Sequence, residues 1–157
     1  MMELIGKTNE EKIWNYLSSI IDNKHGVAGL MGNLYFTSLL DPQHVETSFL
    51  QKYKLTKREY TANADKFPFL FNRDEAGYGL ANWSFWRKKE ELRNYASLRN
   101  KSVGDLKLQL EFLTMELQDD YPQVWETICN VKNIKEVSDK ILKDYMGKTG
   151  KAIQDKC

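Results

Sequence analysis

The sequence predicts an all-α protein with a single globular domain over residues 1–157. Apolar residues recur at offsets of three and four through much of the chain, which is the period of a helix with one buried face. Thr8-Asn9-Glu10-Glu11 and Thr56-Lys57-Arg58-Glu59 both have the spacing of a capping box, a hydrogen-bonded helix start. With 157 residues, 41% of them hydrophobic, the chain can bury one sizeable core.

Two helices are predicted before residue 43. The first runs from about residue 9 to 22, behind the Thr8 capping box. The second covers residues 25–42 and contains Gly26, Gly29 and Gly32 at one-turn spacing. Each glycine costs a helix interior about 1 kcal/mol relative to alanine. The three together therefore predict a buried central helix, with another backbone packed against its narrow side, that ends at Asp41-Pro42.

Residues 43–80 contain weaker helical signals. Residues 43–55 are expected to be irregular or to form a short helix, and Thr56 predicts a helix to about residue 65. Residues 66–80 contain the run Phe67-Pro68-Phe69-Leu70-Phe71 without a helical period, and we expect an aromatic-lined loop or a small hairpin there. This segment is the expected rim of a cleft beside the central helix.

The remaining residues predict further helices. Ser84 is expected to cap a helix to about residue 100, and Ser102 the next one. Tyr121-Pro122 predicts the start of a short helix, and Asn133 the start of a last one. The helix after Ser102 is the clearest, because its apolar stripe consists of Val103, Leu106, Leu110, Leu113 and Leu117.

Charge and composition exclude several classes of protein. The chain has 23 basic and 22 acidic side chains, so direct binding of nucleic acid is not expected. His25 and His44 lack a cysteine or carboxylate at ligand spacing, and neither a metal nor another cofactor is predicted. Cys129 and Cys157 are expected to be free thiols. The N-terminus lacks a secretory apolar run, which predicts a cytoplasmic location or association with a virion, without membrane insertion.

Two motifs carry a resemblance to a known family. They are Gly29-x-x-Gly32-Asn33-x-x-x-Thr37-Ser38-x-x-Asp41-Pro42 and Gly77-Tyr78-Gly79-Leu80-Ala81-Asn82-Trp83. From about residue 10 to 145 the chain resembles the phage tail lysozymes, which are lysozyme-like peptidoglycan hydrolases. The resemblance implies a lysozyme-like fold and a peptidoglycan-type glycan as substrate.

The resemblance also implies which residues would carry the chemistry. Family members have a glutamate where this chain has Thr37, and that glutamate protonates the glycosidic oxygen. An alcohol is too weak an acid for this step, and the Thr37 hydroxyl is expected instead to bond a preceding backbone carbonyl. Asp74 and Glu75 resemble the family's second acid by position. Adjacent loop acids are more often solvated or turn caps, so both alternatives stay open.

The same motifs supply candidate substrate-binding residues. Tyr35 and Tyr78 are expected to offer aromatic faces to sugar rings, as are Trp83, half-buried beneath Tyr78, and Trp86, although helical aromatics are usually core. Asn82 stands at the family's glutamine position. Asn33 lies within an apolar helix and needs a hydrogen-bond partner, expected in the backbone of residues 77–83.

Two functions follow from these residues. One is a protein that has lost hydrolysis and serves as a binding module or as an inhibitor of a host protein, for example a bacterial defence protein. The other is an active peptidoglycan glycosidase that uses Asp74 or Glu75. The first is preferred, because Thr37 has no evident substitute as acid.

Overall fold

The computed structural model describes residues 3–147, which form helices joined by turns and two isolated β-bridges. The prediction of an all-α, lysozyme-like fold is confirmed. In chain order the helices are α1 (Asn9–Ile20), α2 (Lys24–Ser38), α3 (Thr47–Tyr53), α4 (Lys57–Lys66), α5 (Pro68–Arg73), α6 (Trp86–Leu98), α7 (Leu106–Asp120), α8 (Pro122–Asn130) and α9 (Ile134–Ile141), and α9 continues into a π-helical turn, η1 (Leu142–Met146).

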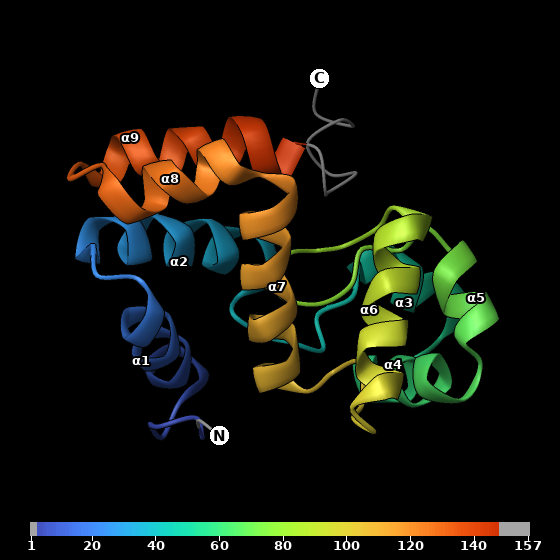
Figure 1. The fold of residues 1–157 in the computed structure, drawn as a ribbon. Helices are drawn as coiled ribbons and strands as arrows, with labels where there is room; N and C mark the ends of the chain where they lie inside the picture. Colours follow the sequence, from blue (N-terminus) through green and yellow to red (C-terminus); the bar gives the residue numbers. More distant parts are fainter. Residues whose placement is uncertain (1–2, 148–157) are drawn as a thin grey trace.

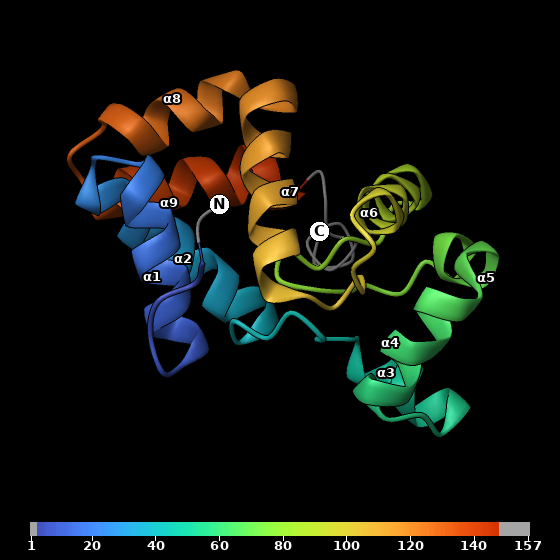
Figure 2. The same ribbon diagram turned by 60° about the horizontal axis from the view of Figure 1, so that its bottom comes forward.

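The helices form two groups, which Figures 1 and 2 show from different directions. Helices α1, α2, α7, α8 and α9 make one group, and α3 to α6 make the other. The segments 39–46 and 74–85 run between the groups. They are joined by backbone hydrogen bonds from Gly79 N to His44 O (2.8 Å) and from Glu46 N to Gly77 O (3.3 Å). This pairing places the Gly77–Trp83 motif between the two groups.

Helix α2 is a central helix with a narrow side, as its glycines predict. A Cβ atom on Gly26 would lie 1.7 Å from the backbone oxygen of Ile128 in α8, and one on Gly29 would lie 2.7 Å from Val137 in α9. The prediction is wrong for Gly32, where a Cβ would meet nothing within 4 Å. Two of the three glycines therefore allow α8 and α9 to approach α2 closely.

Helix α2 ends earlier than the proline predicts. Its last residue is Ser38, because Leu39 (φ 58°) and Leu40 (φ 60°) both adopt the left-handed conformation. The Leu39 N–H donates to the carbonyl of Tyr35, which closes the last turn. Asp41 and Pro42 consequently lie in the connection toward α3.

Several helix starts are confirmed. Thr8 accepts a hydrogen bond from Glu11 N (3.1 Å), and Asn133 accepts one from Glu136 N (2.9 Å). Thr56 and Glu59 form the complete predicted capping box. The caps at Ser84 and Ser102 are wrong.

The two failed caps have local causes. Helix α6 is preceded by Phe85 without a side-chain cap, and α7 by Asp105, whose carboxylate accepts from Leu108 N (3.0 Å). Ser102 instead donates to Asp65 in α4 (2.6 Å). A carboxylate three residues closer to the helix therefore takes the capping position.

Residues 66–80 are not a hairpin as a whole. Pro68 starts the short helix α5, since proline suits a first helical turn. Hairpin-like pairing occurs later, where Tyr78 and Trp83 exchange backbone hydrogen bonds of 3.0 and 2.9 Å. Helix α5 has six residues, which is too short for a helical period to be recognised within the run of aromatic residues.

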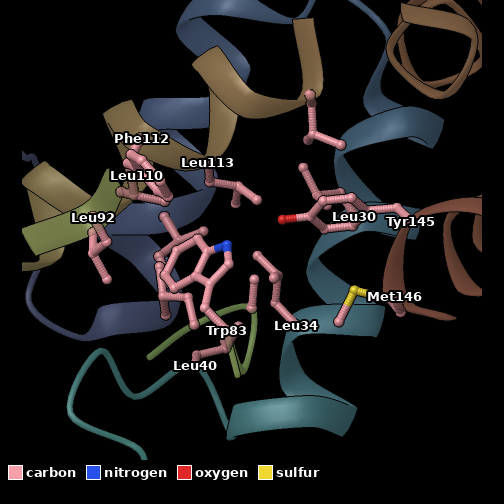
Figure 3. Packing of buried hydrophobic residues seen from close by; sticks show 14 of the residues in the cluster. Leu30, Leu34, Leu40, Trp83, Leu92, Leu110, Phe112, Leu113, Tyr145 and Met146 are labelled. Carbon is pink, nitrogen blue, oxygen red and sulfur yellow. The ribbon is translucent and has the colours of Figure 1, made fainter. Parts of the chain in front are cut away.

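The core of the larger group surrounds Trp83. Figure 3 shows Trp83 and Tyr145 directed toward each other among leucines of α2 and α7. Trp83, Tyr145 and Leu34 are fully buried, and Phe112 packs edge-on against the Trp83 ring at 5.3 Å between centroids. The tryptophan of the second motif is thus a central core residue.

Candidate functional site

Thr37 lies in the last turn of α2, half-buried and close to the left-handed turn that ends the helix. A hydrogen bond from the Thr37 hydroxyl to a preceding carbonyl is predicted, but the structure has this bond at the next residue, where Ser38 Oγ donates to Leu34 O (2.9 Å). Asp41 accepts from Gln43 N (2.8 Å) and pairs with Lys57. The carboxylate nearest to Thr37 in the sequence therefore stabilises a turn.

The surface beside Thr37 is apolar. Tyr35, Phe36 and Leu39 are 52%, 76% and 69% exposed, and we refer to them as the α2-end patch. These three residues lie within five positions of each other at the end of one helix, and contiguous exposed apolar surface marks sites where proteins bind other molecules. Apart from the Tyr35 hydroxyl, their side chains offer no hydrogen-bonding group to a sugar.

The aromatic residues of the second motif do not face solvent, which corrects their predicted place at the surface. Tyr78 and Trp83 are both 0% exposed. The Tyr78 hydroxyl lies 2.7 Å from Thr61 Oγ1, and its ring is stacked at 5.4 Å on Tyr60. The Trp83 Nε1–H donates to the Glu116 carboxylate (3.1 Å). Each ring is held inside one helix group, so neither presents a face to a sugar.

The turn between these two rings is held by a buried side chain. Gln109 accepts from Leu80 N (2.9 Å) and donates to the carbonyls of Pro42 and Val103 (both 2.6 Å). Gly79 has φ 82°, and a Cβ there would lie 2.8 Å from Gln109 Oε1. The glycine is required by both its conformation and this contact.

The amide side chains of Asn82 and Asn33 also point into the protein. Asn82 has φ 54°, is 4% exposed, and places its Oδ1 against Gly77, where a Cβ would lie 2.0 Å away. Asn33 is 7% exposed and donates to Gly29 O (3.0 Å) and Ser138 O (3.2 Å), not to residues 77–83 as predicted. The second bond joins α2 to α9. Of the six residues predicted to contact substrate, Tyr35 and Trp86 have exposed side chains.

Asp74 belongs to a buried ion pair. Its carboxylate pairs with Lys89, which is 0% exposed, and accepts from the Tyr60 hydroxyl and from Ala76 N (3.0 Å). Lys89 also donates to the Tyr60 oxygen (2.9 Å) and to Ala76 O (2.8 Å). Burial lowers the pKa of Lys89, and the Asp74 charge opposes that shift. Both oxygens of the Asp74 carboxylate are therefore engaged by neighbouring protein groups.

Glu75 faces a different environment from its neighbour. It lines a hollow of about 420 Å³ between α5 and α6, with Phe69, Trp86 and Glu90 among the other lining residues. Glu75 has φ 59°, which is uncommon for a residue other than glycine and is found at functional sites. Trp86 is 46% exposed. Of the two predicted acids, Glu75 is the one beside open space and exposed aromatic rings.

Glu116 in α7 is a buried acid that is not among the residues predicted from the sequence. It is 2% exposed, accepts from Trp83 Nε1 and the Tyr145 hydroxyl, and has its Oε2 3.4 Å from Lys88 Nζ. Burial raises the pKa of the Glu116 carboxyl, although these partners lower it. A raised pKa suits a general acid, but a carboxyl enclosed in the core cannot reach a substrate. Its position between Leu113 and Leu117 of the apolar stripe is a signal that would have found it.

The described residues supply few features for a metal or a membrane. Within residues 3–147, no three His, Cys, Asp or Glu side chains gather in a way that could hold a metal ion. None of the helices in that range combines the length and apolarity needed to cross a bilayer. Cys129 is a free, half-buried thiol, and Cys157 lies outside the described residues.

Comparison with known proteins agrees with the fold and the motifs. A family model described as phage tail lysozyme matches residues 8–156, nearly the whole chain. No curated protein and no solved structure matches the chain. The chain therefore belongs to the phage tail lysozyme family.

Proposed function

We propose that this chain is a lysozyme-like protein without hydrolytic activity that serves as a protein-binding module, acting on a host protein. The observation that carries the proposal is the last turn of α2. There, Thr37 stands where the resemblance puts the family's acid, and the exposed residues of the α2-end patch adjoin it in the sequence. On this assignment the turn lacks the proton donor and presents apolar side chains to solvent.

The state of two other acids supports the proposed loss of hydrolysis. Asp74 is held by Lys89 and Tyr60, and Glu116 is enclosed in the core, which leaves Glu75 as the acid beside open space. Loss of general acid catalysis lowers a rate by about 10²- to 10⁴-fold. Wild-type protein is therefore expected to clear purified peptidoglycan at no more than about 1% of the rate of a member with the acid.

A clearing assay tests the absence of hydrolysis. Turbidity of purified peptidoglycan is followed with wild type, Thr37→Glu and Thr47→Glu, the last being a matched control that adds the same charge at an exposed site on α3. Thr37→Glu is expected to raise the clearing rate above wild type, and Thr47→Glu is not. Clearing by wild type at a rate equal to that of an acid-bearing relative would overturn the proposal.

Binding through the α2-end patch is tested separately. Phe36→Asp places a charge on the patch, and Leu98→Asp makes the same change on an 85% exposed leucine of α6. Tagged proteins are cross-linked in host lysate, and the proteins captured by each variant are compared. Phe36→Asp is expected to lose a protein that wild type and Leu98→Asp retain. Equal capture by all three proteins would exclude the patch as the binding surface.

A second candidate function, an active glycosidase, is favoured by the position of Glu75. Glu75 and Glu90 line one hollow together with Trp86, and glycosidases use paired carboxylates. If wild type clears peptidoglycan, Glu75→Gln abolishes clearing under this alternative, whereas Glu59→Gln, an exposed change on α4, leaves it unchanged.

A further inference from the structure

Helices α3, α4 and α5 surround a cavity of about 490 Å³, which we call the α3–α5 pocket. Its apolar walls include Phe49 and Tyr53 from α3, Ala64 from α4, and Leu70 and Phe71 from α5. Small-molecule sites in proteins typically enclose about 300–1,000 Å³ and are lined mainly by apolar and aromatic side chains. The pocket has both the size and the lining of such a site.

The rim of the pocket keeps large apolar side chains in contact with water. Tyr53, Phe67 and Leu70 are 52%, 55% and 64% exposed. Helix α3 contributes no fully buried residue to the core. The small helix group is therefore incompletely filled on this side, and a ligand seated there would remove apolar surface from water, which favours binding.

One carboxylate with spare hydrogen-bonding capacity lines the pocket. Asp74 lines the pocket, and its described partners are Lys89 and Ala76 on Oδ1 and Tyr60 on Oδ2. A carboxylate has about four lone-pair sites, so these partners leave one site on Oδ2. The pocket thus has a mainly apolar lining in which Asp74 is the one carboxylate, and the lining also includes the polar side chains of Tyr60, Asn63 and Arg73.

We propose that the α3–α5 pocket binds a small planar aromatic molecule carrying one hydrogen-bond donor. The aromatic body lies between Phe49, Phe67 and Phe71, and the donor is directed at Asp74 Oδ2. The volume of the pocket, about 490 Å³, is that of a site for a small molecule. This site shares no residue with the α2-end patch, so it stands whether or not the proposed protein-binding function is correct.

Occlusion of the pocket tests the assignment, with indole as the probe. Ala64 lines the cavity and is 3% exposed, so Ala64→Leu extends into the empty volume. Ala62→Leu makes the same change on the exposed face of α4. Titration calorimetry and ligand-observed NMR are expected to show indole binding at least tenfold weaker to Ala64→Leu and within twofold of wild type to Ala62→Leu. Equal binding by the three proteins, or no saturable binding by wild type, would overturn the proposal.

Two further measurements keep the test decisive. Indene has the shape of indole without the N–H, and it is expected to bind at least threefold more weakly because it leaves Asp74 without a donor. If circular dichroism shows that Ala64→Leu is unfolded, Phe67→Ala is used, since it removes a half-exposed wall of the pocket. It is expected to weaken indole binding about threefold, and unchanged binding would count against the site.

Discussion

Replacing Asp74 with asparagine removes the carboxylate that pairs with the buried ammonium of Lys89. Lys89 is fully buried, and its other contacts are with neutral groups: it donates to the Tyr60 oxygen and Ala76 O, and its Nζ lies 4.3 Å from the centroid of the Phe71 ring. Breaking a buried ion pair from one side costs about 3–5 kcal/mol, because it leaves an uncompensated charge. Asp74→Asn is therefore expected to lower the free energy of unfolding by about 3–5 kcal/mol.

The assay is urea unfolding at pH 7, followed by far-ultraviolet circular dichroism. Asp119→Asn, an exposed change on α7, is the matched control and is expected to stay within about 0.5 kcal/mol of wild type. The double variant Asp74→Asn with Lys89→Met removes both charges, and it is expected to recover at least half of the loss. An unchanged unfolding midpoint for Asp74→Asn would refute the structural role of the pair and return Asp74 to the list of catalytic candidates.

Three other perturbations test separate parts of the fold. Gly26→Ala is expected to lower the free energy of unfolding in a urea melt by at least about 3 kcal/mol, because the added Cβ would overlap the Ile128 carbonyl. Gly32→Ala is expected to stabilise by up to about 1 kcal/mol, because a Cβ there would meet no atom within 4 Å. Equal effects of the two changes would contradict the packing of α2. Burial raises the pKa of the Glu116 carboxyl in the folded state. Above pH 4.5 the folded state therefore binds more protons at this group than the unfolded state does. The group's contribution to stability is full below that pH and is lost as the pH rises through the folded pKa. Glu116→Gln is expected to remove this part of the pH slope between pH 4 and 8, and parallel slopes for the two proteins would contradict it. Asn82→Gln is expected to cost about 1 kcal/mol or more, since φ is 54° and glutamine tolerates the left-handed region less well than asparagine, while Asn82→Gly is expected to be tolerated; a melt that ranks the two variants in the opposite order would refute the argument from conformation.

The conformation of residue 82 bears on the design of the hydrolysis test. The resemblance implies a glutamine where this chain has Asn82, and the shorter amide suits both the positive φ and the contact with Gly77. Replacing Asn82 with glutamine is expected to strain the turn, which is why Thr37→Glu is best tested alone.

Local signals predicted the helices well where side chain and backbone interact within a few residues. The Thr56 capping box and the Asn133 cap depend on a donor three residues away, and both formed as expected. The cap at Ser102 failed because Asp105, three residues nearer the helix, takes the capping position, while Ser102 donates to Asp65, which is distant in the sequence. A contact with a distant residue cannot be read from a local pattern.

The candidate site was less predictable for the same reason. Asp74 and Glu75 are adjacent in the sequence and have the same charge, yet one is paired with a buried lysine and the other lines an open hollow. Their roles depend on Lys89 and Trp86, which reach them from another helix. Spacing in the sequence identified the acids but did not distinguish them.

The sequence by itself determined the helical class, most helix starts, the family and the absence of a carboxylate at position 37. Each of these depends on residue identity and on spacing within a few turns. Only the tertiary structure decided that Tyr78, Asn82 and Trp83 point inward, and that the last turn of α2 exposes an apolar surface. Burial depends on which distant segments cover a side chain, and that follows from the packing of the whole chain.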